Sequence, residues 1–305
     1  MDLVTASLGA RIALDPTQFI GIPFALVGAV FLSLGAQFQH RGVNKVEAST
    51  PADRGRGLNI KQLGLLLARP SWVIGTGLLG FAITFQLISL VFSPLIVVQP
   101  LGAVALVITA ILNSRISKIK LNRASILAIC LCVGGVGLFV TVAAFTARET
   151  PVTDRDLITI LIILGVVIVV FGAAFAFLRN RFKAVIYVIG AGVLYGFVAT
   201  LAKVVIARIG QGEFEWLTFT CLVALLAAVA LGAYFVQNAY ASGPPDLVIA
   251  GLTVIDPLVA VAIGIVVLQE AAEAPIWAGV AFLASSAIAI IGVYLLARYH
   301  PQIHD

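Results

Sequence analysis

Nine apolar runs, each long enough to cross a lipid bilayer, follow one another along the chain and leave few folds open to it. A membrane-spanning helix needs about 20 apolar residues, because each residue adds 1.5 Å along the helix axis. Only 11% of the 305 residues are charged, whereas a soluble domain has about 25%. We therefore expect one all-α membrane domain over residues 1–305, with nine transmembrane helices. The runs cover residues 18–38, 71–92, 94–113, 123–146, 156–178, 184–207, 215–239, 246–269 and 275–297.

The connections between the runs differ in length and charge. The second run passes into the third at Phe92, Ser93 and Pro94, and a proline there predicts a tight turn because it cannot continue a helix cleanly. Residues 39–70 form the one long polar linker. Within it, residues 58–68 are amphipathic, so they lie either on the membrane surface or in a plain loop.

The lysines and arginines of the connections are unevenly divided between the two sides of the membrane. Alternate connections and the C-terminal tail hold most of them, whereas the other side has Arg11, Arg148, Arg155 and Arg208. Loops rich in lysine and arginine stay in the cytoplasm. This distribution predicts a plasma-membrane protein with its N-terminus outside and its C-terminus in the cytoplasm. No cleavable signal peptide is expected, because no basic segment and no small-residue cleavage site accompany the first run.

An internal repeat relates the two halves of the chain. When Pro100 is aligned with Pro257, residues 100–113 and 257–270 are identical at six of fourteen positions. We predict a first repeat over residues 18–146, a linking helix over 156–178 and a second repeat over 184–297. Because five spans separate equivalent helices, the second repeat is expected to be inverted, which is typical of secondary transporters.

The segment SWVIGTGLLGFAITFQLISLVFSPLIVVQPLGA (71–103) and its continuation VALVITAILNS (104–114) resemble the NIPA-type magnesium transporter branch of the drug/metabolite transporter superfamily. The second half, GLTVIDPLVAVAIGIVVLQE, resembles the EamA-type repeat, in which a glutamate follows a proline, and Glu270 matches that glutamate. The first half lacks the equivalent acid and has Asn113 thereabouts. The resemblance implies transport of magnesium or a related divalent cation.

Asp256 is the polar residue that most strongly indicates a site. It lies about eleven residues into the eighth run, and an ionisable residue inside a membrane marks a functional site by default. Pro257 follows it and removes the hydrogen bond to the carbonyl of Thr253. A carboxylate beside a released carbonyl can bind a cation or a proton, so we expect Asp256 to be the coupling group and the one candidate metal ligand. A protonated Asp256 bonded to a neighbouring helix is the structural alternative.

Glutamines supply the other candidate ligands. Gln99 precedes Pro100, a second helix break, as Asp256 precedes Pro257, and Gln86 and Gln237 each lie eight residues before a proline. We expect these side chains to line a central cavity, and hydrogen bonding between helices is the alternative.

Charged residues near the ends of the spans carry weaker signals. Lys203 either reaches the membrane surface with its long stem or serves as the counter-ion of Asp256. The acids of the predicted outer face either attract cations or solvate loops. They are Glu149, Asp154, Asp156, Glu213, Glu215, Glu270 and Glu273.

Transport by a secondary transporter is the function that these features favour. An exporter or flippase of an amphipathic or lipid-linked solute, a carrier of a small organic metabolite, and a non-transporting scaffold subunit stay open as alternatives, as does a homodimeric assembly. An enzyme is not expected, because the histidines are confined to positions 40, 300 and 304 and no phosphate-binding loop is present. Neither a cofactor nor a nucleic-acid partner is expected, since the basic residues lie between apolar runs.

Overall fold

The computed structural model describes residues 19–49, 68–117, 122–178, 184–242 and 245–299, and these residues form helices without any strand. The predicted surface segment 58–68 lies outside this described part except for its last residue. The helices are α2 (Gly21–Ser49), α4 (Pro70–Phe92), α5 (Leu95–Val98), the 3-10 turn η2 (Gln99–Leu101), α6 (Gly102–Ser117), α7 (Arg123–Thr146), α8 (Asp154–Leu178), α9 (Ala184–Gly210), α10 (Trp216–Ser242), α11 (Pro245–Val266) and α12 (Ile276–Tyr299).

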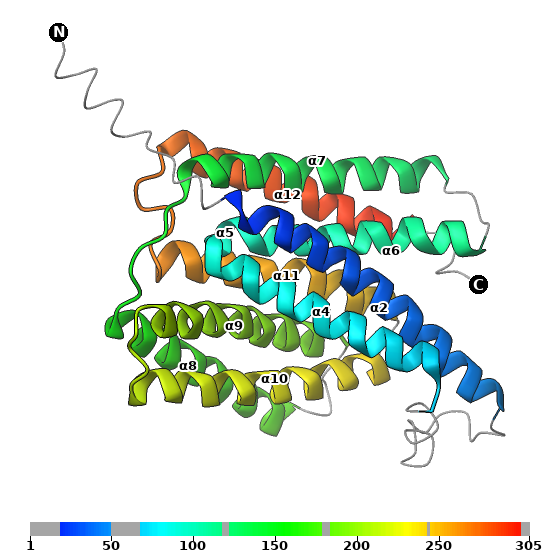
Figure 1. Ribbon diagram of the computed structural model, residues 1–305, viewed down its shortest axis with the longest axis horizontal. Coiled ribbons are helices and arrows are strands. Elements are labelled where there is room, and N and C mark those ends of the chain that lie inside the picture. The colour runs from blue at the N-terminus through cyan, green and yellow to red at the C-terminus, as the bar shows by residue number, and fades with distance from the viewer. Residues whose placement is uncertain (1–18, 50–67, 118–121, 179–183, 243–244, 300–305) are drawn as a thin grey trace, which may run out of the picture.

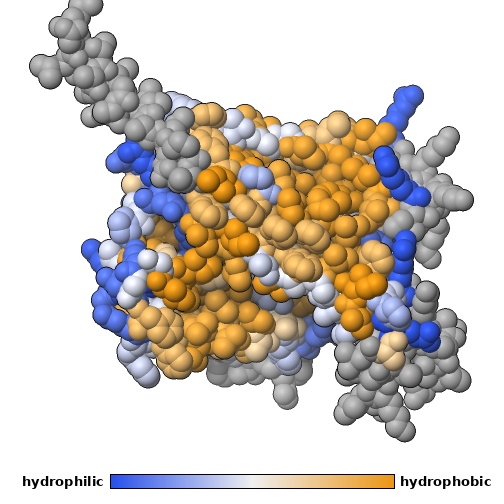
Figure 2. Space-filling model, in the orientation of Figure 1, coloured by the Kyte–Doolittle hydropathy of each residue, from blue (hydrophilic) through white to orange (hydrophobic). Residues whose placement is uncertain are grey.

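Within the described ranges nine helical segments are long and apolar enough to cross a membrane, which confirms the predicted spans. The outer surface of the bundle is apolar: Val169 on α8 is 69% exposed and Leu283 on α12 is 76% exposed. Figure 2 shows this apolar surface across the middle of the molecule, with hydrophilic residues at both ends. Such an apolar surface is stable against the hydrocarbon chains of a bilayer, so this is a multi-pass membrane protein.

The helices run back and forth between two ends of the bundle (Figure 1). At one end, which we call the Glu149 end, α4 meets α5, α7 meets α8, α9 meets α10 and α11 meets α12. At the opposite end, the Ser49 end, α2 finishes, and α12 brings the chain back there. Helix α2 continues to Ser49, eleven residues beyond the predicted end of the first span, because no proline or glycine cap stops it at residue 38.

Close approach of glycines holds the bundle together in pairs of helices. α2 packs along α4, α9 packs against both α10 and α11, and α7 packs along α12. A Cβ atom added to Gly75 would lie 2.8 Å from the carbonyl oxygen of Gly35, and one added to Gly192 would lie 2.7 Å from Ile255. Small residues at these contacts let the backbones pack directly. The predicted linking helix is α8, which contacts α9 and α10, and the inverted relation of the two repeats stays a prediction.

The third span begins with a break, as the proline pattern predicts. Helix α4 ends at Phe92, Ser93 takes an extended conformation and α5 starts after Pro94. The four residues of α5 are at most 1% exposed, so this short helix lies in the core of the bundle. The span then continues through the 3-10 turn at Pro100 into α6.

Candidate functional site

A central cavity of about 460 Å³ lies between α2 and α4 on one side and α9 and α11 on the other, with the start of α6 closing it. This volume is typical of sites that bind small molecules. The walls come from the first, second, third, sixth and eighth spans. The residues that line the central cavity are Ala25, Gly28, Ala29, Leu32, Ala82, Ile83, Gln86, Leu87, Leu90, Gln99, Gly102, Tyr195, Val198, Ala199, Ala202, Leu252, Thr253, Asp256 and Pro257.

Asp256 is the acidic residue of this wall. It lies near the middle of α11, and Pro257 interrupts the hydrogen bonding of the same helix. The Oδ1 atom of Asp256 is buried and has no hydrogen-bond partner within the described part of the chain. A buried carboxylate oxygen without a donor is costly, and Oδ1 does not join α11 to a neighbouring helix within the described part of the chain.

Gln86 and Gln99 line the same cavity from α4 and from the 3-10 turn. Gln99 is 7% exposed, and Pro100 holds it where the third span changes from α5 to α6. Each amide offers one accepting oxygen and two donors. The structure thus brings Gln86, Gln99, Thr253 and Asp256 together around one space.

Two predicted site residues lie elsewhere. Gln237 on α10 is exposed on the surface of the bundle and is not part of the cavity wall. Lys203 is 6% exposed, and its ammonium group contacts Glu149 rather than Asp256. Lys203 thus pairs with Glu149 in this structure, and its functional role stays a prediction.

Residues 17–190 match the sequence family described as Magnesium transporter NIPA. The chain belongs to this family. The match covers more than half of the sequence and includes α2, α4 and the third span, which supply one half of the cavity wall. Members of the family are transporters rather than enzymes, and the NIPA resemblance of residues 71–103 is confirmed.

Two curated relatives are similar to this NIPA chain. An uncharacterized protein of Corynebacterium glutamicum is 25% identical over 284 residues, which cover 92% of the chain and 96% of that protein. A probable magnesium transporter, NIPA4 of Arabidopsis thaliana, is 36% identical over 117 residues, which cover 38% of the chain and 32% of that protein. No solved structure matches the chain.

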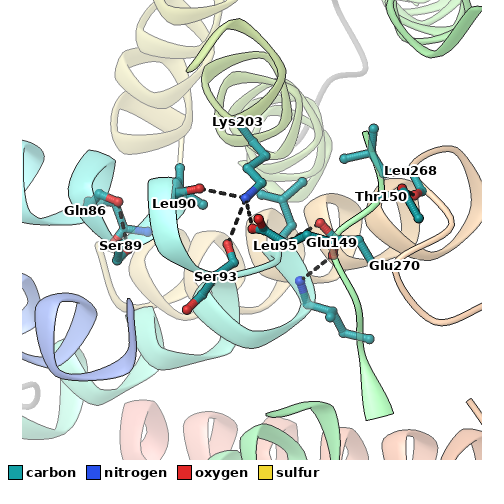
Figure 3. Close-up of polar contacts among 11 residues, drawn as sticks. Gln86, Ser89, Leu90, Ser93, Leu95, Glu149, Thr150, Lys203, Leu268 and Glu270 are labelled. Atoms are coloured by element: carbon teal, nitrogen blue, oxygen red, sulfur yellow. Dashed lines mark hydrogen bonds and ion pairs between the residues drawn. The ribbon is translucent and has the colours of Figure 1, made fainter. Parts of the chain in front are cut away.

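The Glu149 end of the NIPA chain holds a buried polar network that the sequence did not predict (Figure 3). The Lys203 ammonium group donates to the carbonyl oxygens of Leu90 at 2.7 Å and Ser93 at 3.0 Å, and it forms an ion pair with Glu149. Pro94 explains why the Leu90 carbonyl is available to Lys203. The carbonyl of Leu90 would bond to the N–H of residue 94 in a continuous helix, and proline has none.

Glu270 completes this network, although its position after the eighth span had suggested a solvated loop. It is 3% exposed, and its two carboxylate oxygens accept from the backbone N–H groups of Leu95 and Ile96 at 2.9 Å each. Gln269 takes a left-handed conformation with φ 56°, and this reversal turns Glu270 back into the protein. Gly264 leaves room for the carboxylate, since a Cβ there would lie 2.7 Å from Oε2.

Burial raises the pKa of Glu270 to about 6, against the lowering effect of the two backbone N–H groups and of Lys203, while Glu149 raises it further. The connection between α7 and α8 packs over the same place. Thr150 donates to the carbonyl of Leu268, and the N–H of Arg148 donates to the carbonyl of Glu270. The network therefore joins segments from both halves of the chain.

Proposed function

We propose that this chain is a secondary transporter of Mg²⁺, which passes through the central cavity and contacts Asp256 on the way. Membership of a magnesium transporter family supports the assignment of Mg²⁺ as the substrate. The cavity between the two halves of the chain supports the route, because secondary transporters bind their substrates between repeats near the middle of the membrane.

The cavity is compatible with a hydrated magnesium ion. Mg²⁺ prefers octahedral oxygen ligands and gives up its water reluctantly. Six waters occupy about 180 Å³ at the volume of liquid water, and the central cavity has about 460 Å³. We therefore infer that Mg²⁺ keeps most of its waters here. Asp256 would balance part of the charge, while the amides of Gln86 and Gln99 hydrogen-bond to the waters.

The observation that carries this proposal is the place of Asp256 in the cavity wall, together with the lack of a donor to its Oδ1 atom among the described residues. A structural aspartate would use its oxygens to join helices. The described residues contain no cluster of three or more histidines, cysteines and acids, so a dehydrated ion would find too few protein ligands. A single carboxylate suits an ion that is held through water.

Uptake by proteoliposomes with a magnesium-sensitive dye inside tests the proposal. Wild-type protein should raise the internal Mg²⁺ signal, and Asp256→Asn, which keeps the shape and removes the charge, should lower the rate at least tenfold. Glu215→Gln is the matched control, because Glu215 is an exposed acid outside the cavity wall. Normal uptake by Asp256→Asn would refute the role of Asp256. Absence of Mg²⁺ uptake by wild-type protein would refute the substrate and return attention to organic or lipid-linked solutes.

The distribution of basic residues also gives the proposed orientation of the chain in the membrane. We place the chain in the plasma membrane with the Ser49 end in the cytoplasm and the Glu149 end outside. The described arginines at the Ser49 end include Arg41, Arg69, Arg115, Arg123 and Arg298, and basic residues favour the cytoplasmic side.

A further inference from the structure

The ammonium group of Lys203 is surrounded by oxygens of the kinds that bind cations in proteins. Its three N–H donors face three oxygens, from the carbonyls of Leu90 and Ser93 and from the carboxylate of Glu149. We call these three oxygens the ammonium cage. Carbonyl and carboxylate oxygens are also the ligands that Mg²⁺ and Ca²⁺ take from proteins.

The ammonium cage stands between the central cavity and the Glu149 end of the bundle. Leu90 belongs to the cavity wall, so one oxygen of the cage comes from a residue that the cavity reaches. The Glu149 side chain is 36% exposed, whereas that of Lys203 is 8% exposed. A cation that left the cavity toward this end would therefore meet the cage before it met the solvent.

The backbone holds the cage in place from two directions. Pro94 removes the helical partner of the Leu90 carbonyl, so that this oxygen must bind something else in the apolar interior. On the other side of the turn, Glu270 binds the N–H groups of Leu95 and Ile96. The turn between α4 and α5 is thus fixed independently of Lys203, and the two carbonyl oxygens of the cage should keep their positions without the ammonium group.

We propose that the ammonium cage is a second cation site on the transport route, which Lys203 occupies in this conformation as a tethered competitor. When the Lys203 side chain moves away, the transported cation takes its place on the same three oxygens and keeps water on its remaining positions. This inference rests on the proposed cation transport for its biological meaning, although the site itself can be tested without transport.

Thermal unfolding of the purified protein in detergent tests the site. Lys203→Met keeps the apolar stem and removes the ammonium group, so it should leave the cage vacant. Added MgCl₂ should then raise the apparent melting temperature of Lys203→Met by about 3 °C at ten times its dissociation constant. The rise should exceed that of wild-type protein, in which Lys203 competes. Choline chloride at the same ionic strength is the salt control, and Lys203→Ala serves if the methionine variant does not fold.

Two further variants assign the effect. Lys203→Met/Glu149→Gln removes the carboxylate of the cage and should lose the part of the Mg²⁺ response that exceeds the wild-type response. Lys203→Met/Asp256→Asn should keep it, because Asp256 does not contribute to the cage. This second variant distinguishes the two proposals. If it keeps the Mg²⁺ response while Asp256→Asn transports Mg²⁺ normally, the role of Asp256 is refuted and the cage is still supported.

Three results would overturn the cation site. The first is an equal Mg²⁺ response in wild type and Lys203→Met. The second is a response above that of wild type that survives Glu149→Gln. The third is stabilisation of Lys203→Met by methylammonium chloride but not by MgCl₂, which would show a cage that accepts only an ammonium group.

Discussion

Replacement of Glu270 by alanine should destabilise the protein although this residue follows the end of a span. The change removes the acceptors of the Leu95 and Ile96 N–H groups, and both residues are fully buried. A buried group that loses its partner costs about 1–3 kcal/mol, so the two together cost about 2–6 kcal/mol. Removal of the buried Glu270 charge offsets part of this loss of stability. The pKa of Glu270 rises from 4.5 to about 6, which corresponds to about 2 kcal/mol.

The net loss is therefore about 2 kcal/mol at neutral pH, or about 4 °C in melting temperature. Intrinsic-fluorescence melting curves in detergent measure it. Glu273→Ala is the control, because Glu273 is an exposed acid of the same connection that pairs with Arg148, and exposed ion pairs contribute less than about 1 kcal/mol. If Glu270→Ala melted within 1 °C of wild type, the capping of α5 by Glu270 would be refuted.

The same residue predicts a pH dependence with a definite sign. Because the folded-state pKa lies above the ordinary value, the folded protein binds the proton more tightly, and this contribution to stability is lost as the pH rises from 4.5 through 6. The groups that face Glu270 are Lys203 and Glu149. Relative to Glu270→Gln, which does not titrate, wild-type protein should lose up to about 2 kcal/mol across this interval. A difference that stayed flat between pH 4.5 and 7 would contradict this account.

Two other predictions concern packing and orientation. Gly196→Ala should cost about 1–3 kcal/mol by melting temperature, because its Cβ would lie 2.7 Å from Val259 and 3.0 Å from the Asp256 carbonyl. Gly80→Ala, with nothing within 4 Å, should cost nothing. Single cysteines at Ser49 and Glu215, in a background without native cysteines, should react with an impermeant thiol reagent from opposite sides of the membrane, with Glu215 outside. Reaction of both from one side would refute the nine-span topology.

The sequence was sufficient to predict the spans and the main break. Their length and hydropathy follow directly from the thickness of the bilayer, and Pro94 marks the turn between α4 and α5 because it cannot donate a hydrogen bond. The cavity residues Gln99 and Asp256 were also predictable, since each precedes a proline within an apolar run.

The inward face of each helix was harder to predict, because lipid and protein interior are equally apolar. Gln237 lies in a span as apolar as that of Gln86, but the first is exposed on α10 and the second faces the cavity. A soluble helix would reveal its buried face by an apolar stripe, and a membrane helix lacks that contrast.

The network at the Glu149 end depends on contacts that no local pattern reveals. Glu270 follows a helix end, where an acid usually solvates a loop, and its partners lie 174 and 175 residues away in the sequence. The one available signal was Pro94. The rule that predicted a released carbonyl for Pro257 applies equally to Leu90, and an intramembrane lysine is a donor that such a carbonyl requires.

Pro94 and Pro257 have the same physical effect on the helices that line the central cavity. A backbone carbonyl that loses its helical partner inside a membrane must find a donor, water or a cation. Pro94 releases the carbonyl of Leu90, which Lys203 binds, and Pro257 interrupts α11 beside Asp256 and Thr253 in the cavity wall. Leu90 and Thr253, whose carbonyls lose their helical partners to these two prolines, both line the central cavity. Under the proposed function, a cation that keeps most of its waters would meet carbonyl oxygens without a helical partner at both breaks, which reduces the number of charged residues that an apolar bundle needs to carry it.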